Sequence, residues 1–98
     1  MKKTAVVILN WNGKKLLEKF LPGVIRFSSH IADIIIADNN STDDSVLFVS
    51  SNFPGVQIKR LEKNFGFAEG YNIALSKLSH EYCILLNSDI EVTEKWIE

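Results

Sequence analysis

The chain lacks features that would assign it to several protein classes. Its one cysteine, Cys83, lies inside an apolar run, so an internal disulfide framework is excluded and the role of a small buried hydrophobe is expected. The formal net charge of −1 comes with singly scattered lysines, which argues against nucleic-acid binding. Apolar runs reach only strand length, too short for a signal peptide or a membrane span. We therefore expect a soluble, unexported domain in a reducing compartment.

Well-known ligand-binding motifs are also absent. The sequence 10–13, Asn-Trp-Asn-Gly, stands where a dinucleotide-binding domain would carry Gly-x-Gly-x-x-Gly. No P-loop sequence occurs, and no acidic pair follows the first apolar run. The two histidines, His30 and His80, lie in polar segments without a spaced ligand partner, so solvated side chains are expected rather than a zinc site.

What is present is a regular alternation of strand and helix signals. At 98 residues, the chain is sized for one small domain. The runs of strand length are 4–9, 31–37, 56–61 and 82–86. Each is followed by a segment with helical periodicity, the last of them beginning near Thr93. This βαβαβαβα order predicts a Rossmann-like parallel α/β sheet with right-handed crossovers and helices on both faces.

Local signals suggest how the first two helices begin and end. Asn12 is placed to cap the first helix, and Pro22-Gly23 should kink or split it. Ser41 and Asp44 have the spacing of a capping box for the second helix.

Burial patterns separate the last two strands. Residues 56–61 alternate apolar and polar side chains, which predicts a half-buried strand near an edge of the sheet. Residues 83–86 carry no charge and predict a strand buried on both faces.

Polar residues follow every predicted strand. They are Asn10 and Trp11, Asp38 and Asn39, Asn64 and Gly66, and Asn87 and Asp89. Ligands bind beyond the carboxyl ends of strands in open α/β sheets, so a carboxylate such as Asp89 suits a divalent cation or a ribose hydroxyl. Taken alone, residues 87–89 favour an ordinary polar turn after a strand over a ligand site.

Four segments together resemble a known family, the nucleotide-sugar glycosyltransferases of the GT-A fold, and in particular its inverting family 2. The segments are Val6-Val7-Ile8-Leu9-Asn10-Trp11-Asn12, Ile36-Ala37-Asp38-Asn39-Asn40-Ser41-Thr42-Asp43, Asn64-x-Gly66-Phe67-Ala68-x-Gly70-x-Asn72 and Leu85-Leu86-Asn87-Ser88-Asp89. They occur in the family's order and spacing and cover almost the whole chain. Each is weak alone, but the four in register are specific.

The resemblance implies a metal site at the end of the last strand. Asp89 corresponds to the ligand for Mg²⁺ or Mn²⁺, which bridges the diphosphate of a nucleotide-sugar donor. Asn87 departs from the aspartate found in many members, which removes the second carboxylate, but its amide is still able to hydrogen-bond to the ribose. The Asn-x-Asp sequence is similar to that of rhamnosyltransferase-like members.

The resemblance also assigns the other strand-end residues to the donor nucleotide: Asn10, Trp11, Asp38, Asn39, Asn64 and Gly66. The Asn39 amide can both accept from and donate to a pyrimidine, whereas Asp38 can only accept. Trp11 stands where the family places an aromatic ring against the base, with a core role as the alternative. Gly66 shapes the loop that closes over the nucleotide. Tyr71 replaces a phosphate-contacting arginine of many relatives.

The implied function is transfer of a sugar, with inversion, from a UDP- or dTDP-linked donor to a saccharide or lipid-linked acceptor in polysaccharide biosynthesis. Residues 1–98 correspond to the nucleotide-binding half of an incomplete GT-A domain, without the acceptor half and its catalytic base, so activity of the chain itself is left open. The alternative is a non-catalytic α/β binding or interaction module. A cytoplasmic location, peripheral to the inner face of the membrane, and self-association through an exposed strand edge complete the expectations.

Overall fold

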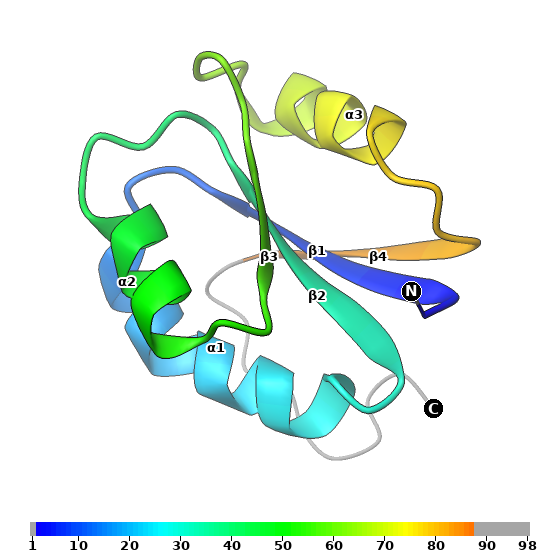
Figure 1. Cartoon of the computed structure of the whole chain (residues 1–98). Helices are drawn as coiled ribbons and strands as arrows, with labels where there is room; N and C mark the ends of the chain where they lie inside the picture. The colour runs from blue at the N-terminus through cyan, green and yellow to red at the C-terminus, as the bar shows by residue number, and fades with distance from the viewer. Residues whose placement is uncertain (1, 88–98) are drawn as a thin grey trace.

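The structure is a computed structural model that describes residues 2–87, in which strands and helices alternate strictly (Figure 1). The elements are β1 (Thr4–Asn10), α1 (Lys14–Ser28), β2 (Ala32–Asp38), α2 (Ser45–Asn52), β3 (Gln57–Arg60), α3 (Phe67–Ser76) and β4 (Tyr82–Asn87). Within residues 2–87, every helix is too short or too polar to cross a lipid bilayer.

The strands form one fully parallel sheet in the order β3-β2-β1-β4. β1 pairs with β2 through Val6 opposite Ile34, and with β4 through Val6 opposite Ile84. The two central strands are runs of β-branched residues buried on both faces, as parallel strands require. All four strands point the same way, so their carboxyl ends lie at one edge.

Helices cover both faces of the sheet, which confirms the predicted fold class. α1 and α2 lie on one face and α3 on the other (Figure 1). Along β1, Val6 and Ile8 pack in the cluster with α1 and α2, whereas Ala5 and Val7 pack with α3. The chain moves outward from β1 to β3 and then returns past β1 to β4. Because connections between parallel strands are right-handed as a rule, the reversal of direction places α3 on the face opposite α1 and α2. The strand order therefore reverses between β1 and β4, which is a topological switch point.

α1 runs from Lys14 to Ser28 as one helix, so Pro22-Gly23 does not split it, and the alternative of a kink stays a prediction. Proline inside a helix removes one hydrogen bond at a cost of about 3 kcal/mol. The buried residues Leu17, Leu21 and Val24 lie on both sides of the interruption, and their packing against the sheet offsets that cost.

Neither expected helix cap is formed as the sequence suggested. Gly13, not Asn12, is the N-cap of α1, and no side chain caps it. Asn12 has a positive φ of 50°, and its Oδ1 accepts from the Thr42 and Asp43 backbone N–H groups at 2.7 and 3.1 Å. α2 begins at Ser45, too late for a capping box from Ser41. The reason is that the side chains of Asn12 and Ser41 bond between the loop after β1 and the loop after β2 instead of capping the helices.

The two edges of the sheet differ from each other. β3 is an edge strand, as predicted. β4 pairs only with β1 among the described strands, so the prediction of burial on both faces is wrong: Cys83 is exposed and Leu85 is 49% exposed. The prediction rested on the apolar composition of β4, which is typical of a strand with neighbours on both sides, and residues 2–87 supply only β1. Self-association through this edge stays a prediction.

His80 is not solvated, contrary to expectation. Its side chain is buried, and Nε2 lies 2.7 Å from Asp33 Oδ2, which also accepts from the Lys2 backbone N–H at 3.1 Å. The hydrogen bond with His80 holds the pKa of the Asp33 carboxyl below its ordinary value. The pair joins the α3–β4 connection to the beginning of β2, at the sheet end opposite the strand-end loops.

Candidate functional site

The loops after β1, β2 and β3 meet at the carboxyl edge of the sheet. The backbone ladder continues past the strand ends, with Asn39 N–H donating to Asn10 O and Leu61 N–H donating to Asp38 O, each at 2.8 Å. These bonds keep the three loops in register. The polar residues of three strand ends are thereby brought together.

Asp38 is the centre of a buried network that uses its whole carboxylate. Oδ1 accepts from Asn10 Nδ2 at 2.9 Å and from Ser41 Oγ at 2.6 Å, and Oδ2 accepts from the Ser41 backbone N–H at 2.9 Å. Arg60 lies 3.9 Å away from Oδ2 and donates to Ser41 O at 3.0 Å. A fully buried carboxylate is tolerated because it is hydrogen-bonded in this way.

Asn10 is the partner that carries this network into the next loop. Its Nδ2 also donates to Ser41 Oγ at 3.2 Å, while its Oδ1 accepts from the Gly13 backbone N–H at 3.1 Å. Asn10 is fully buried. The geometry therefore makes Asn10 and Asp38 supports of the loop conformation in this structure, and neither lines the pocket described below.

Asn39 ties the β2 end to the loop before α3. Its Nδ2 donates to Gly66 O at 3.0 Å, and its Oδ1 accepts from the Phe65 backbone N–H at 3.1 Å. The residue is only 2% exposed. A Cβ on Gly70 would stand 2.8 Å from Asn39 Nδ2, so the amide occupies the space that a side chain at position 70 would need.

The loop before α3 has the backbone geometry that the sequence predicted for Gly66. Its φ of +81° and ψ of −177° fall in a region that side chains disfavour, which confirms that expectation. Asn64 Oδ1 accepts from the Gly66 backbone N–H at 2.8 Å and closes the turn. The loop ends at Phe67, the first residue of α3.

A pocket of about 270 Å³ opens between these loops. It is lined by Leu9, Trp11, Asn39, Asn64, Gly66 and Phe67. Trp11 is 54% exposed and Phe67 is 63% exposed, so the alternative of a core role for Trp11 is wrong. The pocket thus has two rings and an aliphatic side chain together with two amides.

The structure divides the predicted site residues into separate places. Trp11, Asn39, Asn64 and Gly66 border the pocket, and Asn10 and Asp38 lie buried behind it. Asn87 ends β4 opposite Leu9, at the same edge, and Asp89 lies outside the described residues. Sequence reasoning missed Leu9 and Phe67, although each adjoins a residue that it had identified.

Tyr71 links α3 to the switch point. Its hydroxyl donates to Leu86 O at 2.9 Å and accepts from the Leu9 backbone N–H at 3.3 Å, so one hydroxyl bridges β1 and β4 near their carboxyl ends. Burial raises the pKa of the Tyr71 phenol. Tyr71 therefore positions the strands rather than presenting a charge to a phosphate.

The described residues do not form a metal site by themselves. Residues 2–87 contain no group of three or more His, Cys, Asp or Glu side chains arranged to hold an ion. Both oxygens of Asp38 already accept hydrogen bonds from the protein. The predicted ligand, Asp89, lies beyond these residues.

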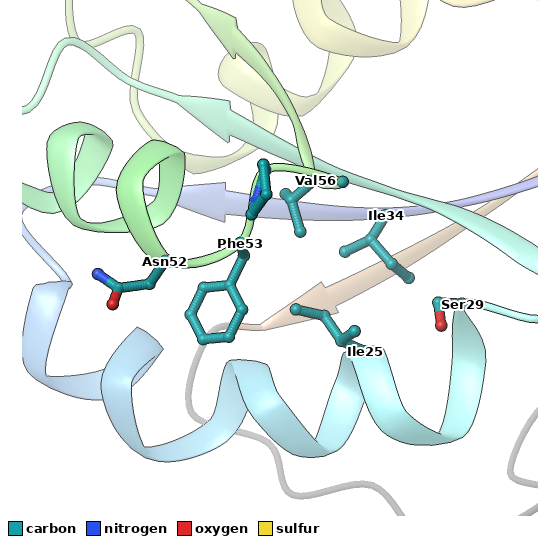
Figure 2. A pocket seen from close by; sticks show the side chains of 8 residues that line it. Ile25, Ser29, Ile34, Asn52, Phe53 and Val56 are labelled. Carbon is teal, nitrogen blue, oxygen red and sulfur yellow. The ribbon is translucent and has the colours of Figure 1, made fainter.

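A second, larger pocket of about 350 Å³ lies elsewhere, on the α1 and α2 face. Figure 2 shows Ile25, Ile34, Phe53 and Val56 converging on it from α1, β2 and the segment after α2. It lies away from the carboxyl edge and has few polar groups to orient a ligand. The smaller pocket is therefore the stronger candidate site.

The fold and the site define an α/β domain of the Rossmann-like class, with a pocket at the carboxyl edge of a parallel sheet. The sequence profile of glycosyl transferase family 2 matches residues 5–98, and the chain belongs to this family. A search of curated protein sequences returned no match.

Solved structures share the fold. TarS 1–349 from S. aureus in complex with UDP-GlcNAc superposes with a TM-score of 0.81 at 22% identity, over 97% of this chain and 28% of that one. Mannosyltransferase PcManGT from Pyrobaculum calidifontis, in complex with GDP-Man and Mn²⁺, superposes with a TM-score of 0.74 at 19% identity, over 91% of this chain and 28% of that one. The sheet is thus of the GT-A type, and the chain spans less than a third of these proteins.

Proposed function

We propose that this chain forms the donor-nucleotide half of a family 2 glycosyltransferase, which transfers a sugar with inversion from a UDP- or dTDP-linked donor to a saccharide or lipid-linked acceptor. The observation that carries the proposal is the pocket at the carboxyl edge. Loops after three successive strands build it in a chain that belongs to family 2. The place agrees with the switch-point rule for ligand sites in parallel sheets.

The structural neighbours support a nucleotide-sugar donor. TarS 1–349 was solved with UDP-GlcNAc and with UDP, and PcManGT with GDP-Man and Mn²⁺. In this chain, the exposed Trp11 ring offers a face for the base, and the Asn64 amide lies at the pocket wall beside Asn39, whose own amide holds the loop. The Asn-x-Asp sequence at 87–89 supports the rhamnosyltransferase-like branch within the family.

A divalent cation held by Asp89 completes the proposed donor site. β4 ends at Asn87, beside Leu9 of the pocket, and Asp89 follows two residues later in the sequence. Mg²⁺ or Mn²⁺ prefers carboxylate oxygens and phosphates, and it neutralises the negative charge of a diphosphate. The proposed setting is cytoplasmic, at the inner face of the membrane, in polysaccharide biosynthesis.

Calorimetric titration of the protein with UDP and with dTDP, each with and without Mn²⁺, tests the proposal. We expect binding that requires Mn²⁺ and that Asp89→Ala abolishes. Asp44→Ala is the matched control, because Asp44 is an exposed carboxylate that pairs with the exposed side of the loops through Lys14, and this variant should bind normally. Failure of the unsubstituted protein to bind either nucleotide would instead favour a non-catalytic interaction module.

A further inference from the structure

Two large aromatic side chains, Trp11 and Phe67, are exposed at the same pocket instead of being buried in the core. Trp11 comes from the loop after β1, and Phe67 from the first turn of α3. They are 56 positions apart in the sequence, yet both border one pocket together with Leu9. Exposed rings of this size, gathered at one concave place, indicate a binding surface.

The Phe67 ring is held in place from two sides. It stands edge-on to Tyr71, with ring centroids 4.9 Å apart at an angle of 80°. The Tyr71 hydroxyl is in turn bound to the backbones of β1 and β4. On the other side, Asn39 fixes the backbone of residues 65 and 66, directly before Phe67. The ring is therefore positioned before any ligand arrives.

The dimensions and polarity of the pocket fit one planar ring system. Its volume of about 270 Å³ lies just below the range of about 300–1,000 Å³ typical of pockets for complete drug-sized ligands. The two rings and Leu9 supply apolar surface for the faces of a flat ligand. The Asn39 amide already bonds to Phe65 and Gly66 of the loop, so it is not the main contact for a ligand in this pocket.

We propose that Phe67 is a second base-binding residue, which together with Trp11 forms an aromatic slot for the nucleobase of the donor. The inference rests on the proposed function and adds a residue that contributes to affinity for the base. Recognition through ring faces is tolerant of the base, because every nucleobase has a π-face. We therefore expect uridine, thymidine and guanosine diphosphates to bind with similar affinities.

The test separates the base from the diphosphate. Dissociation constants of the protein are measured by calorimetry for UDP, for uridine and for pyrophosphate in the presence of Mn²⁺. Stacking of a base on an aromatic side chain predicts that Phe67→Ala weakens uridine and UDP by about 5- to 100-fold. Pyrophosphate binding should be unchanged, and Phe67→Tyr should restore the affinity for both nucleoside ligands.

Leu47→Ala is the matched control, because Leu47 is 66% exposed on α2, outside the pocket lining. It should leave all three affinities unchanged. Unchanged uridine binding in Phe67→Ala would overturn the inference, while binding of UDP by the unsubstituted protein would preserve the proposed function. Equal losses for uridine and pyrophosphate would also overturn it, since they would indicate a misplaced helix. If the unsubstituted protein binds none of the three, the proposed function fails first.

Discussion

The polar residues that end β2 and the aromatic residues beside β1 and α3 occupy the same edge of the sheet but are used in opposite ways. Asp38 is fully buried, and both oxygens of its carboxylate accept hydrogen bonds from Asn10 and Ser41. Trp11 and Phe67 are more than half exposed and border the pocket. The difference teaches that a polar strand end in a parallel sheet can be a support for the site, while its contact surface comes from the neighbouring loops.

The strongest way to break this comparison is to remove the central support. Asp38→Ala leaves buried donors of Asn10 and Ser41 without acceptors, and each such group costs about 1–3 kcal/mol. We expect the free energy of unfolding to fall by about 2–5 kcal/mol in urea titrations. A variant as stable as the unsubstituted protein that loses nucleotide affinity would show that Asp38 contacts the ligand instead. Asp44→Ala serves as the exposed control.

Removing the hydroxyl between β1 and β4 should have the next largest effect. Tyr71→Phe leaves Leu86 O and Leu9 N–H without their partner, and we expect a loss of about 1–3 kcal/mol in the free energy of unfolding. Tyr82→Phe, on an exposed edge ring, should change it little.

The same substitution should alter the alkaline limit of stability. Because the pKa of Tyr71 is raised in the folded state, its contribution is present below the unfolded value of about 10 and is lost as pH rises through the folded value. Thermal unfolding measured between pH 9 and pH 12 should therefore decline less steeply in Tyr71→Phe. An identical decline in both proteins would contradict the assignment.

The smallest expected effect concerns the contact between Asn39 and α3. Gly70→Ala would place Cβ 2.8 Å from Asn39 Nδ2 and displace an amide that holds the pocket wall. Overpacking outweighs the gain in helix propensity, and we expect a net loss of about 1–2 kcal/mol in urea titrations. Gly23→Ala in α1 meets no atom within 4 Å and should gain about 0.5–1 kcal/mol. Equal effects at both positions would show that the loop yields easily.

Much of the fold could be predicted because its signals are local. Uninterrupted β-branched runs identify the central strands, and their alternation with helical segments identifies a parallel sheet. The edge position of β3 followed from its polar alternation. The continuity of α1 through Pro22 could not be predicted, because it depends on packing against a sheet formed by distant residues. The exposure of β4 likewise depends on which elements accompany it.

The site could be predicted in place but not in detail. Strand-end position identified Trp11, Asn39, Asn64 and Gly66, all of which border the pocket. Nothing local distinguishes them from Asn10 and Asp38, because the Asn10 side chain that joins this network bonds to Asp38 and Ser41, about 30 residues away. Phe67 has the sequence appearance of a core residue, and only the assembled loops show that its ring is exposed.

The close approach of α3 to the Asn39 amide links two positions that are far apart in the sequence. A descendant that acquires a methyl or larger group at position 70 has to replace Asn39 with something shorter, or give up the bonds that hold the turn before α3. Positions 39 and 70 should therefore co-vary among related sequences, because the residue at each position limits the substitutions that the other tolerates.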